Sequence, residues 1–423
     1  MHWFALLALV LIALRTLAQA WLDSLNHRHV LAHAKEVPEA FRTTVDPETY
    51  RKTVDYTLAK SRFGRVELAW GTLVTLTVLF SGILPWGWSA WTHAAGSGVW
   101  ASATGLFLVG VVLALPNLPL EWWSQFRLEE RFGFNTTTGA TWCLDRVKSL
   151  ILAALLGIPL LALLLQLVNW TGNAWWLWGW ATFLGFQILM LILAPVLILP
   201  RFNKFTPLPD GTLKDRLMKL AGRTQFRARS IEVMDGSKRS RHANAFFTGL
   251  GGFRKIVLFD TLISQLGEEE LEAVLAHEIG HFRLRHIPKL FGWSAVMTLL
   301  GFAAVGWLAQ QPWFFQAFGF QTPTVPVALL LFALLADAAT FWFTPLSHVL
   351  SRRFEYQADA FAAQAMGNPK PLVAALRKLY EKNLSNLTPH PLYSGFYYSH
   401  PTLLERETAL RGEGAGGRVG PVG

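Results

Sequence analysis

Charged residues and cysteine are both scarce in this 423-residue chain. Asp, Glu, Lys and Arg together make up 16% of the sequence, whereas about 25% is usual for soluble domains. The single cysteine, Cys143, excludes an intrachain disulfide. Apolar residues are correspondingly abundant. They form 52% of the chain, which contains 19 tryptophans and has a mean hydropathy of +0.31. This composition indicates an integral membrane protein.

Seven apolar stretches are long enough to cross a bilayer, since a membrane helix needs about 20 mostly apolar residues. They are Trp3–Leu22, Val66–Trp86, Gly98–Leu118, Val147–Leu167, Ala174–Leu199, Leu290–Ala309 and Val325–Leu346. The first contains Ala18-Gln19-Ala20, which resembles a signal-peptidase site, so a cleaved signal peptide is the alternative. No positive charge precedes this stretch and Arg15 interrupts it, which favours a retained helix.

Lys and Arg are absent from every second connection between these stretches. The connection after the second stretch has none, and neither do 169–173 and 310–324, whereas Asp23–Arg65 holds eight. The positive-inside rule then predicts an N-terminus outside and a C-terminus in the cytosol. Cleavage of the first stretch would place those eight basic residues outside. The net charge of +10 is thus explained by topology, and no nucleic-acid partner is expected.

The chain divides into five expected parts. Residues 1–199 hold membrane helices one to five with cytosolic loops, 200–289 form a cytosolic catalytic segment, and 290–346 hold helices six and seven. Residues 347–411 form a C-terminal catalytic segment, and 412–423 a Gly-rich, disordered tail. Within 200–289, Ser230–Ser237, Asn244–Gly249 and Lys255–Leu262 are short, rich in β-branched or aromatic residues, and bounded by Gly and Ser. They predict the strands of a small sheet.

A helix follows this sheet, in LGEEELEAVLAHEIGHFRLRHIPKL. Acidic residues crowd its first turn and basic residues its last, as the helix dipole favours, and Pro288 is expected to end it. His277 and His281 are four residues apart, about 40° around the helix axis, so their imidazoles can converge on one ion. Glu278 lies about 60° from His281, too far round to be a ligand beside them but placed to act as a base toward water. This HExxH arrangement predicts a zinc site.

Catalytic zinc usually has three protein ligands, so one more is required. The spacing that would supply a third histidine from the same segment fails, because Leu284 and Ile287 stand where Gly and His are needed, and His286 is one residue off. The segment from Pro345 is helical by its period and carries Glu355 and Asp359 four residues apart. We expect Glu355 to be the third ligand and Asp359 to accept a hydrogen bond from a ligand histidine. The alternative is an acidic pair that offsets Arg352 and Arg353.

At this point the chain resembles a known family, the CAAX prenyl protease 1 family of integral-membrane zinc metalloproteases, also called type I prenyl endopeptidases. The resemblance runs nearly end to end. It rests, in chain order, on RFGFNTTTGATWCLDRVK, DGSKRSRHANAFFTGLGGFRKIVLFDTLI, HEIGH, SRRFEYQADAFA and YSHPTLLERETAL. HEIGH is shared with other membrane zinc proteases, whereas the flanking motifs, in register with seven apolar stretches, are far more restrictive.

The resemblance implies an α-helical polytopic membrane protein whose seven transmembrane helices enclose a chamber, with a cytosolic α+β gluzincin-like zinc metalloprotease domain. It implies one zinc ion per chain, bound by His277, His281 and Glu355, with Glu278 as catalytic base. It further implies that His400 and Arg406 stabilise the oxyanion. Asn244 and Ala245 would lie on the sheet-edge strand that pairs with the substrate backbone.

We therefore expect a membrane-embedded zinc metalloendopeptidase that cuts peptide or protein substrates, prenylated ones included, near their C-termini. The alternative is a general quality-control zinc protease for membrane proteins. A non-enzymatic carrier is disfavoured, because a full set of ligands and a base has little use there. Membrane lipids are expected partners. The expected location is the bacterial inner membrane, or the endoplasmic reticulum membrane in a eukaryotic source, with the active site facing the cytosol. Two explanations stay open for Asp337, a wet interior or local helix packing.

Overall fold

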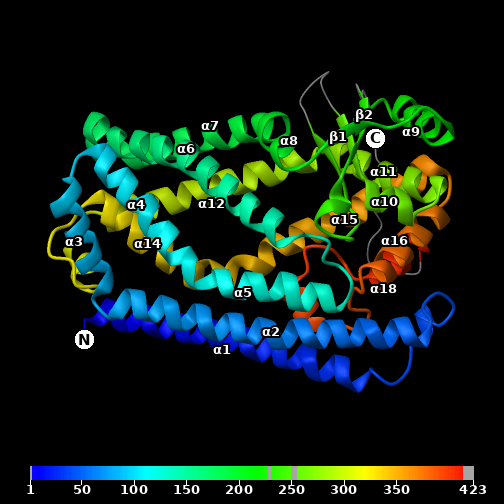
Figure 1. The fold of residues 1–423 in the computed structure, drawn as a ribbon, viewed down its shortest axis with the longest axis horizontal. Coiled ribbons are helices and arrows are strands. Elements are labelled where there is room, and N and C mark those ends of the chain that lie inside the picture. The colour runs from blue at the N-terminus through cyan, green and yellow to red at the C-terminus, as the bar shows by residue number, and fades with distance from the viewer. Residues whose placement is uncertain (1, 227–229, 249–254, 413–423) are drawn as a thin grey trace.

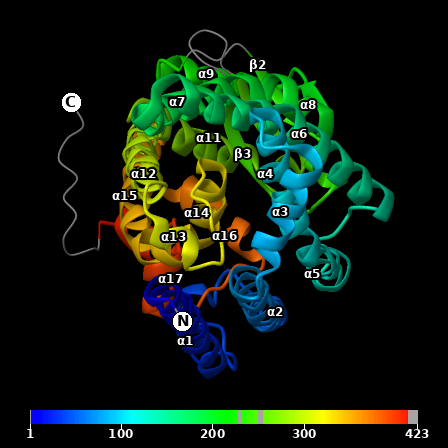
Figure 2. The same cartoon turned by 90° about the vertical axis from the view of Figure 1, so that its left-hand side faces the viewer.

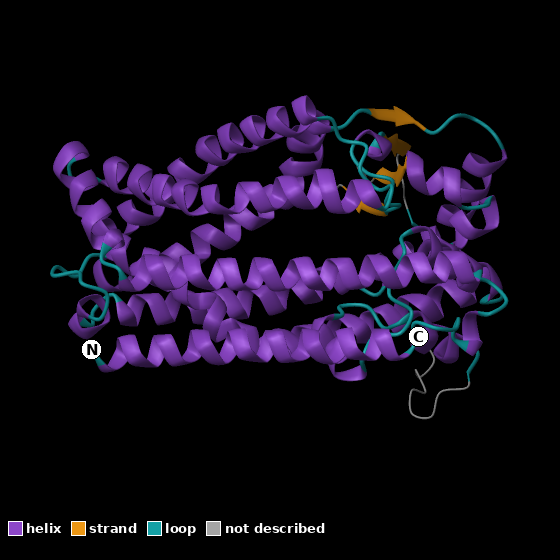
Figure 3. Ribbon diagram, turned by 60° about the horizontal axis from the view of Figure 1, so that its bottom comes forward, coloured by secondary structure: helices purple, strands orange, loops and turns teal. Residues whose placement is uncertain are grey.

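The computed structural model describes residues 2–226, 230–248 and 255–412, and it is mostly helical, with the strands gathered at one end (Figures 1 and 3). The helices are α1 (Trp3–Ala32), α2 (Pro47–Phe80), α3 (Ile83–Ala95), α4 (Val99–Ala114), α5 (Leu118–Trp123), α6 (Gly139–Thr171), α7 (Trp175–Leu193), α8 (Leu199–Phe202), α9 (Thr212–Arg223), α10 (Asp260–Gln265), α11 (Glu268–Arg283), α12 (His286–Leu308), α13 (Pro312–Gln316), α14 (Val325–Thr340), α15 (Thr344–Met366), α16 (Lys370–Lys382), α17 (Pro391–Tyr397) and α18 (Leu403–Leu410). Nearly all of the tail predicted to be disordered, residues 413–423, lies outside the described residues.

Within the described residues, six continuous helical segments are long and apolar enough to cross a membrane. Six of the seven apolar stretches expected from the sequence fall inside these segments to within one residue, and the 64-residue segment Gly139–Phe202 contains two. The stretch Val66–Trp86 instead continues past the end of its segment at Phe80 and into α3. Inside that segment a short 3-10 turn, Gly172–Ala174, separates α6 from α7, and the two helices pack against each other. The membrane-helical architecture is therefore confirmed. How many helices cross, and in which direction, stay predictions.

The first two helices extend beyond a bilayer's thickness. α2 contains 34 residues, about 51 Å at 1.5 Å per residue, whereas the hydrocarbon core is about 30 Å thick. Asp46 caps its first turn, because Asp46 Oδ1 accepts the backbone N–H groups of Glu48 and Thr49 at 2.9 Å each. The far end of α1 reaches the C-terminal segment, where Asn26 Oδ1 accepts the backbone N–H of His390 at 3.0 Å. These helices thus support the C-terminal segment directly.

Viewed along the long axis, the long helices are arranged around a common centre rather than in flat layers (Figure 2). α1 and α14 are joined by an ion pair, in which Arg15 Nη2 lies 2.5 Å from Asp337 Oδ2. The Asp337 side chain is 67% exposed in the isolated chain. An ionisable pair in such apolar helices requires a partner or water, and here each residue has the other. The enclosed chamber stays a prediction.

A four-stranded sheet lies at the end of the molecule opposite the N-terminus (Figure 1). Its order is β1 (Phe205–Pro207), β2 (Ser230–Met234), β4 (Lys255–Phe259) and β3 (Ala245–Thr248). β2 and β4 are parallel, and β3 is antiparallel to β4. The three predicted strands are therefore present, each shorter than expected, and Gly249 lies outside the described residues. β1 was not predicted from the sequence, since three residues that end in proline carry almost no strand signal.

Contrary to the prediction from the sequence, Pro288 does not end the helix that carries HExxH. α11 ends at Arg283, and α12 begins at His286. Pro288 therefore sits in the first turn of α12, where its missing N–H is not needed for an intrahelical bond. The chain passes between the two helices through Arg285, which adopts the left-handed conformation at φ 56° and ψ 39°. A helix long and apolar enough to cross a membrane thus starts directly after the HExxH motif.

Candidate metal centre

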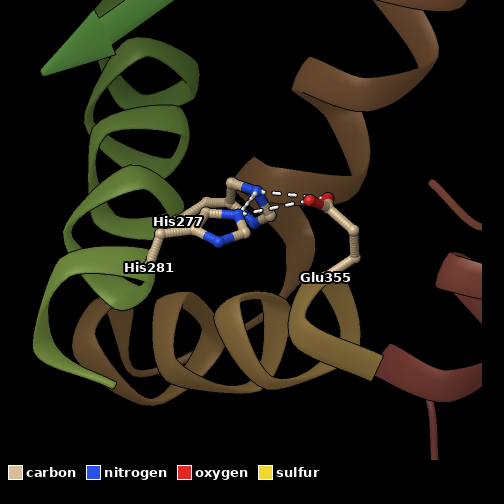
Figure 4. Close-up of side chains that lie close together, drawn as sticks. All are labelled: His277, His281 and Glu355. Atoms are coloured by element: carbon tan, nitrogen blue, oxygen red, sulfur yellow. Dashed lines mark hydrogen bonds and ion pairs between the residues drawn. The ribbon is translucent and has the colours of Figure 1, made fainter. Parts of the chain in front are cut away.

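α11 presents two histidines on one face, where burial restricts the movement of their side chains. Its first turn is closed by Glu270, whose Oε2 accepts the backbone N–H of Gly267 at 2.7 Å. His277 is buried, at 8% exposed, and His281 is partly buried one turn further on. Their Nε2 atoms lie 3.1 Å apart and face the same point (Figure 4).

Glu355 reaches that point from α15, the helix that packs most extensively on α11. Its Oε1 lies 3.3 Å from His281 Nε2, and its Oε2 lies 3.5 Å from His277 Nε2. The close approach of the helices depends on Gly280, since a Cβ there would lie 3.1 Å from Ala358 Cα. Helical periodicity alone would not have identified this requirement.

The three side chains fit a zinc ion. Their ligand atoms all lie within 4.8 Å of one another. Glu355 Oε2 is buried and has no hydrogen-bond donor, and a buried carboxylate oxygen in that state calls for an ion or a water. Two imidazole nitrogens and one carboxylate oxygen are a donor set typical of catalytic zinc, which keeps a further position free.

The second ring nitrogen of His277 is held by a buried charged pair. His277 Nδ1 lies 2.8 Å from Asp359 Oδ1, and Arg406 donates to both oxygens of Asp359 at 2.8 and 2.5 Å. Burial lowers the pKa of His277, but hydrogen bonds to Asp359 and Glu355 outweigh it and raise the pKa to about 9. Asp359 therefore lies where the sequence analysis expected it, against a histidine of the site.

Arg406 is held deep in the protein rather than at the site's mouth. It is 6% exposed, and its Nε and Nη2 point to Asp359. The capping box of α18 and a pair of 2.6 Å bonds between Arg377 and Glu407 fix the helix that carries it. These contacts favour a role for Arg406 in holding Asp359. They do not favour the oxyanion contact that the family resemblance implied.

The second ring nitrogen of His281 is held by residues that the sequence analysis missed. His281 Nδ1 lies 3.0 Å from His286 Nδ1, and His286 Nε2 lies 2.9 Å from Gln357 Oε1. His286 is fully buried, at 0% exposed, and stacks on Phe354 with ring centroids 4.3 Å apart. It is therefore not a ligand in this arrangement but a neighbour of one. The only sequence signal was a histidine one position out of the ligand pattern.

Glu278 and His400 both lie close enough to the three candidate ligands to interact with them electrostatically. Burial raises the pKa of Glu278, while the neighbouring His277 and His281 lower it less strongly. A carboxyl whose pKa lies above its usual range is better suited to proton transfer near neutral pH. The His400 side chain is 61% exposed, and its Nε2 lies 3.3 Å from Glu355 Oε1. His400 can therefore contact a substrate, whereas Arg406 is shielded.

The strand predicted to meet the substrate is at the sheet edge. Among the described strands β3 pairs only with β4 and packs near α11. Asn244 directly precedes β3, and its carbonyl oxygen accepts the Phe259 N–H at 3.1 Å. The N–H of Ala245 donates to the Asn244 side chain at 2.8 Å. An edge with a locally capped N–H can accept an added strand once that cap is released.

Comparisons with known proteins agree with this architecture. Residues 26–204 match the family model for the CAAX prenyl protease N-terminal region, with five membrane helices, and residues 207–414 match peptidase family M48. The chain is similar to CAAX prenyl protease 1 of Saccharomyces cerevisiae, 38% identical over 89% of this chain and 88% of that one. The Arabidopsis thaliana homolog is 37% identical over 89% and 91%, and the human homolog 32% over 91% of each.

A solved structure is similar over almost the entire chain. The crystal structure of S. mikatae Ste24p superposes with a TM-score of 0.86 at 35% identity, covering 95% of this chain and 98% of that one. Both the membrane helices and the segment with the metal centre are therefore shared with that protein. The chain belongs to the CAAX prenyl protease 1 family, the membrane metalloendopeptidases of peptidase family M48.

Proposed function

We propose that this metalloendopeptidase uses zinc, bound by His277, His281 and Glu355, to cut extended peptides near their C-termini, isoprenylated Cys-a-a-X peptides included. The observation that carries the proposal is the convergence of these three side chains beside the edge strand β3, at one end of a body of membrane helices. The printed names of the relatives support the substrate class. We keep the division of the chain at residues 199 and 200, close to the border between the two family models.

When bound, zinc supplies a Lewis acid that polarises the scissile carbonyl and lowers the pKa of water to about 7. The chain's own residues do the rest. The Glu278 carboxylate accepts a proton from the water that attacks the carbonyl carbon. It then gives that proton to the amide nitrogen as the C–N bond breaks. His400 donates to the oxyanion from the exposed side, and Arg406 acts through Asp359.

The substrate backbone would add to β3 as a further strand, positioned by Asn244 and Ala245. Strand addition uses main-chain hydrogen bonds and tolerates many side chains, so it suits an extended C-terminal segment. A lipid attached near the cut could lie against the apolar helices, where each buried CH₂ contributes about 0.8 kcal/mol. A folded domain cannot enter between packed helices. The active site would face the cytosol, since the basic connections and the site lie at the same end.

Mass spectrometry of a farnesylated peptide and its unprenylated form, incubated with zinc-loaded protein in lipid, tests this substrate class. We expect the last three residues to be removed from both peptides, more slowly from the peptide that lacks the farnesyl group. If both peptides stay intact while unfolded membrane proteins are cut internally, the quality-control function replaces this one.

Two variants test the assigned roles. Glu278→Gln should keep its metal and lose about 10²–10⁴-fold in rate, whereas Glu355→Ala should lose metal and activity together. Metal analysis after dialysis, alongside peptide cleavage, separates the two. A Glu278→Gln protein that binds zinc and cuts at the wild-type rate would remove Glu278 from the mechanism.

A further inference from the structure

The two histidines of the metal centre are supported by different kinds of partner. His277 is backed by a carboxylate and a guanidinium, Asp359 and Arg406. His281 is backed by two uncharged side chains, first His286 and then Gln357. Neither His286 nor Gln357 has a place in the mechanism above. Their contacts, at 3.0 and 2.9 Å, are nevertheless within hydrogen-bond distance.

Proton positions along this second chain of contacts follow from its geometry. His281 Nε2 faces Glu355 and His277 Nε2, so it must offer a lone pair to bind a metal. A neutral imidazole then carries its proton on Nδ1. That N–H can donate only to an unprotonated His286 Nδ1, 3.0 Å away. The proton of His286 is consequently on Nε2, where Gln357 Oε1 accepts it at 2.9 Å. Every ring nitrogen has one assignable role.

The surrounding structure holds His286 in this orientation. Its ring is fully buried and lies almost parallel to Phe354, at 7°. Phe354 and Gln357 stand on either side of Glu355 along α15. One turn of α15 therefore supplies a metal ligand together with both groups that orient His286. Rotation of that turn would disturb the Glu355 and His281 positions at once.

The backbone of Arg285, the residue before His286, is strained, which also supports a fixed position for His286. Arg285 has φ 56° and ψ 39°, a left-handed conformation that non-glycine residues seldom adopt. This conformation turns the chain at the end of α11, so that the first residue of α12 folds back onto His281. Strain of this kind persists where surrounding contacts require it, often at functional sites.

We propose that His286, backed by Gln357, is a positioning residue that fixes the tautomer and ring plane of His281 for metal binding. The inference rests on the proposed zinc site, and it deepens that proposal by adding an uncharged counterpart to the Asp359 contact. Outer partners of ligand histidines typically change metal affinity by about 10–100-fold when removed. The competing explanation is that His286 merely fills the core between α12 and α15.

Substitutions that separate ring packing from hydrogen bonding distinguish these explanations. His286→Phe keeps an aromatic ring against Phe354 but removes the acceptor for His281. His286→Asn loses the stacking yet places a carbonyl oxygen near the position of Nδ1. Gln357→Met keeps the volume and removes the acceptor for His286. The exposed His93 on α3, remote from the site, provides the matched control His93→Phe.

The measurement is metal release from full-length protein in lipid, by chelator competition, together with the visible spectrum of the cobalt-substituted form. We expect His286→Phe to release zinc about 10–100-fold faster than wild type and to shift the cobalt bands. Gln357→Met should show a smaller change in the same direction, and His286→Asn should recover part of the loss. His93→Phe should match wild type. Thermal unfolding of the metal-free forms shows whether each variant is folded.

The result that overturns the inference is a folded His286→Phe protein with wild-type metal release and an unchanged cobalt spectrum. A folded His286→Asn protein that releases metal as fast as His286→Phe would also overturn it, since restoring an acceptor near Nδ1 would then recover nothing. If His286→Phe does not fold, Gln357→Met decides: wild-type release there rejects the inference, and faster release supports it. Wild-type protein that binds no zinc at all would instead reject the proposed function.

Discussion

The substitution Asp359→Asn is expected to lower both the stability and the zinc affinity of the protein. Asp359 is 2% exposed and accepts two bonds from the guanidinium of Arg406, itself 6% exposed. The amide keeps the shape but removes the negative charge. Arg406 then stays buried, with Glu355 Oε2 at 3.8 Å as its other carboxylate contact. Its charge is left poorly compensated.

The expected loss of stability follows from that burial. Removing one partner of a buried ion pair costs about 3–5 kcal/mol, because the remaining charge is desolvated and unpaired. This is a large share of the roughly 5–15 kcal/mol by which a domain is stable. For a unit of about 150–250 residues it corresponds to a Tm lower by about 6–20 °C.

Metal binding should weaken for a separate reason. The carboxylate accepts a hydrogen bond from the Nδ1–H of His277 at 2.8 Å, which leaves Nε2 free to bind a metal. An amide can present an N–H there, and the imidazole then carries its proton on the wrong nitrogen. We expect about 10–100-fold weaker zinc affinity.

Thermal unfolding of metal-free protein and chelator competition measure the two effects independently. The double variant Asp359→Leu with Arg406→Leu is the control, because replacing both members of a buried pair by apolar residues is often neutral for stability. It should recover the Tm but not the zinc affinity. An Asp359→Asn protein within about 1 kcal/mol of wild type that still holds its zinc would refute this account of the buried pair.

Three further predictions concern the packing, the protonation and the sidedness of the site. Gly280→Ala should lower both the Tm and zinc retention, because its Cβ meets Ala358 Cα at 3.1 Å. Gly222→Ala on α9, with nothing within 4 Å, should be neutral or slightly stabilising, and equal effects would discount the close helix contact. Burial lowers the pKa of His277 in metal-free protein, but the contacts with Asp359 and Glu355 outweigh it and raise the pKa from 6.5 to about 9. The protonated form of His277 therefore stabilises the fold below pH 6.5, and that stabilisation is lost as the pH rises through about 9. Zinc must displace this proton, so apparent affinity should rise about tenfold per pH unit up to about pH 9, and a flat profile from pH 6.5 to 8.5 would contradict the assignment. Finally, with Cys143→Ser as background, an impermeant thiol reagent on intact cells should label Ser97→Cys, in the exposed loop before α4, and not Ser237→Cys, in the turn after β2. The reverse pattern would invert the topology.

The sequence alone determined the features that depend on local physics. Apolar runs predict the membrane helices, because a backbone in lipid must satisfy its own hydrogen bonds. The spacing of His277 and His281 places them on one face of any helix. The end of α15 also follows from local physics, since the residue after it, Gly367, has φ 77°, which glycine adopts without strain.

Tertiary structure alone decided which side chains meet from distant segments. Arg406 bonds Asp359 across 47 residues of chain, and His286 meets Gln357 across 71. No periodicity reports such distances, because they depend on how closely α11, α15 and α18 pack. The same holds for Pro288, whose effect depends on where the preceding chain turns. The candidate ligands were therefore visible in the sequence, whereas the groups that contact them required the packed helices, since hydrogen bonds between helices are set by side-chain fit rather than by residue order.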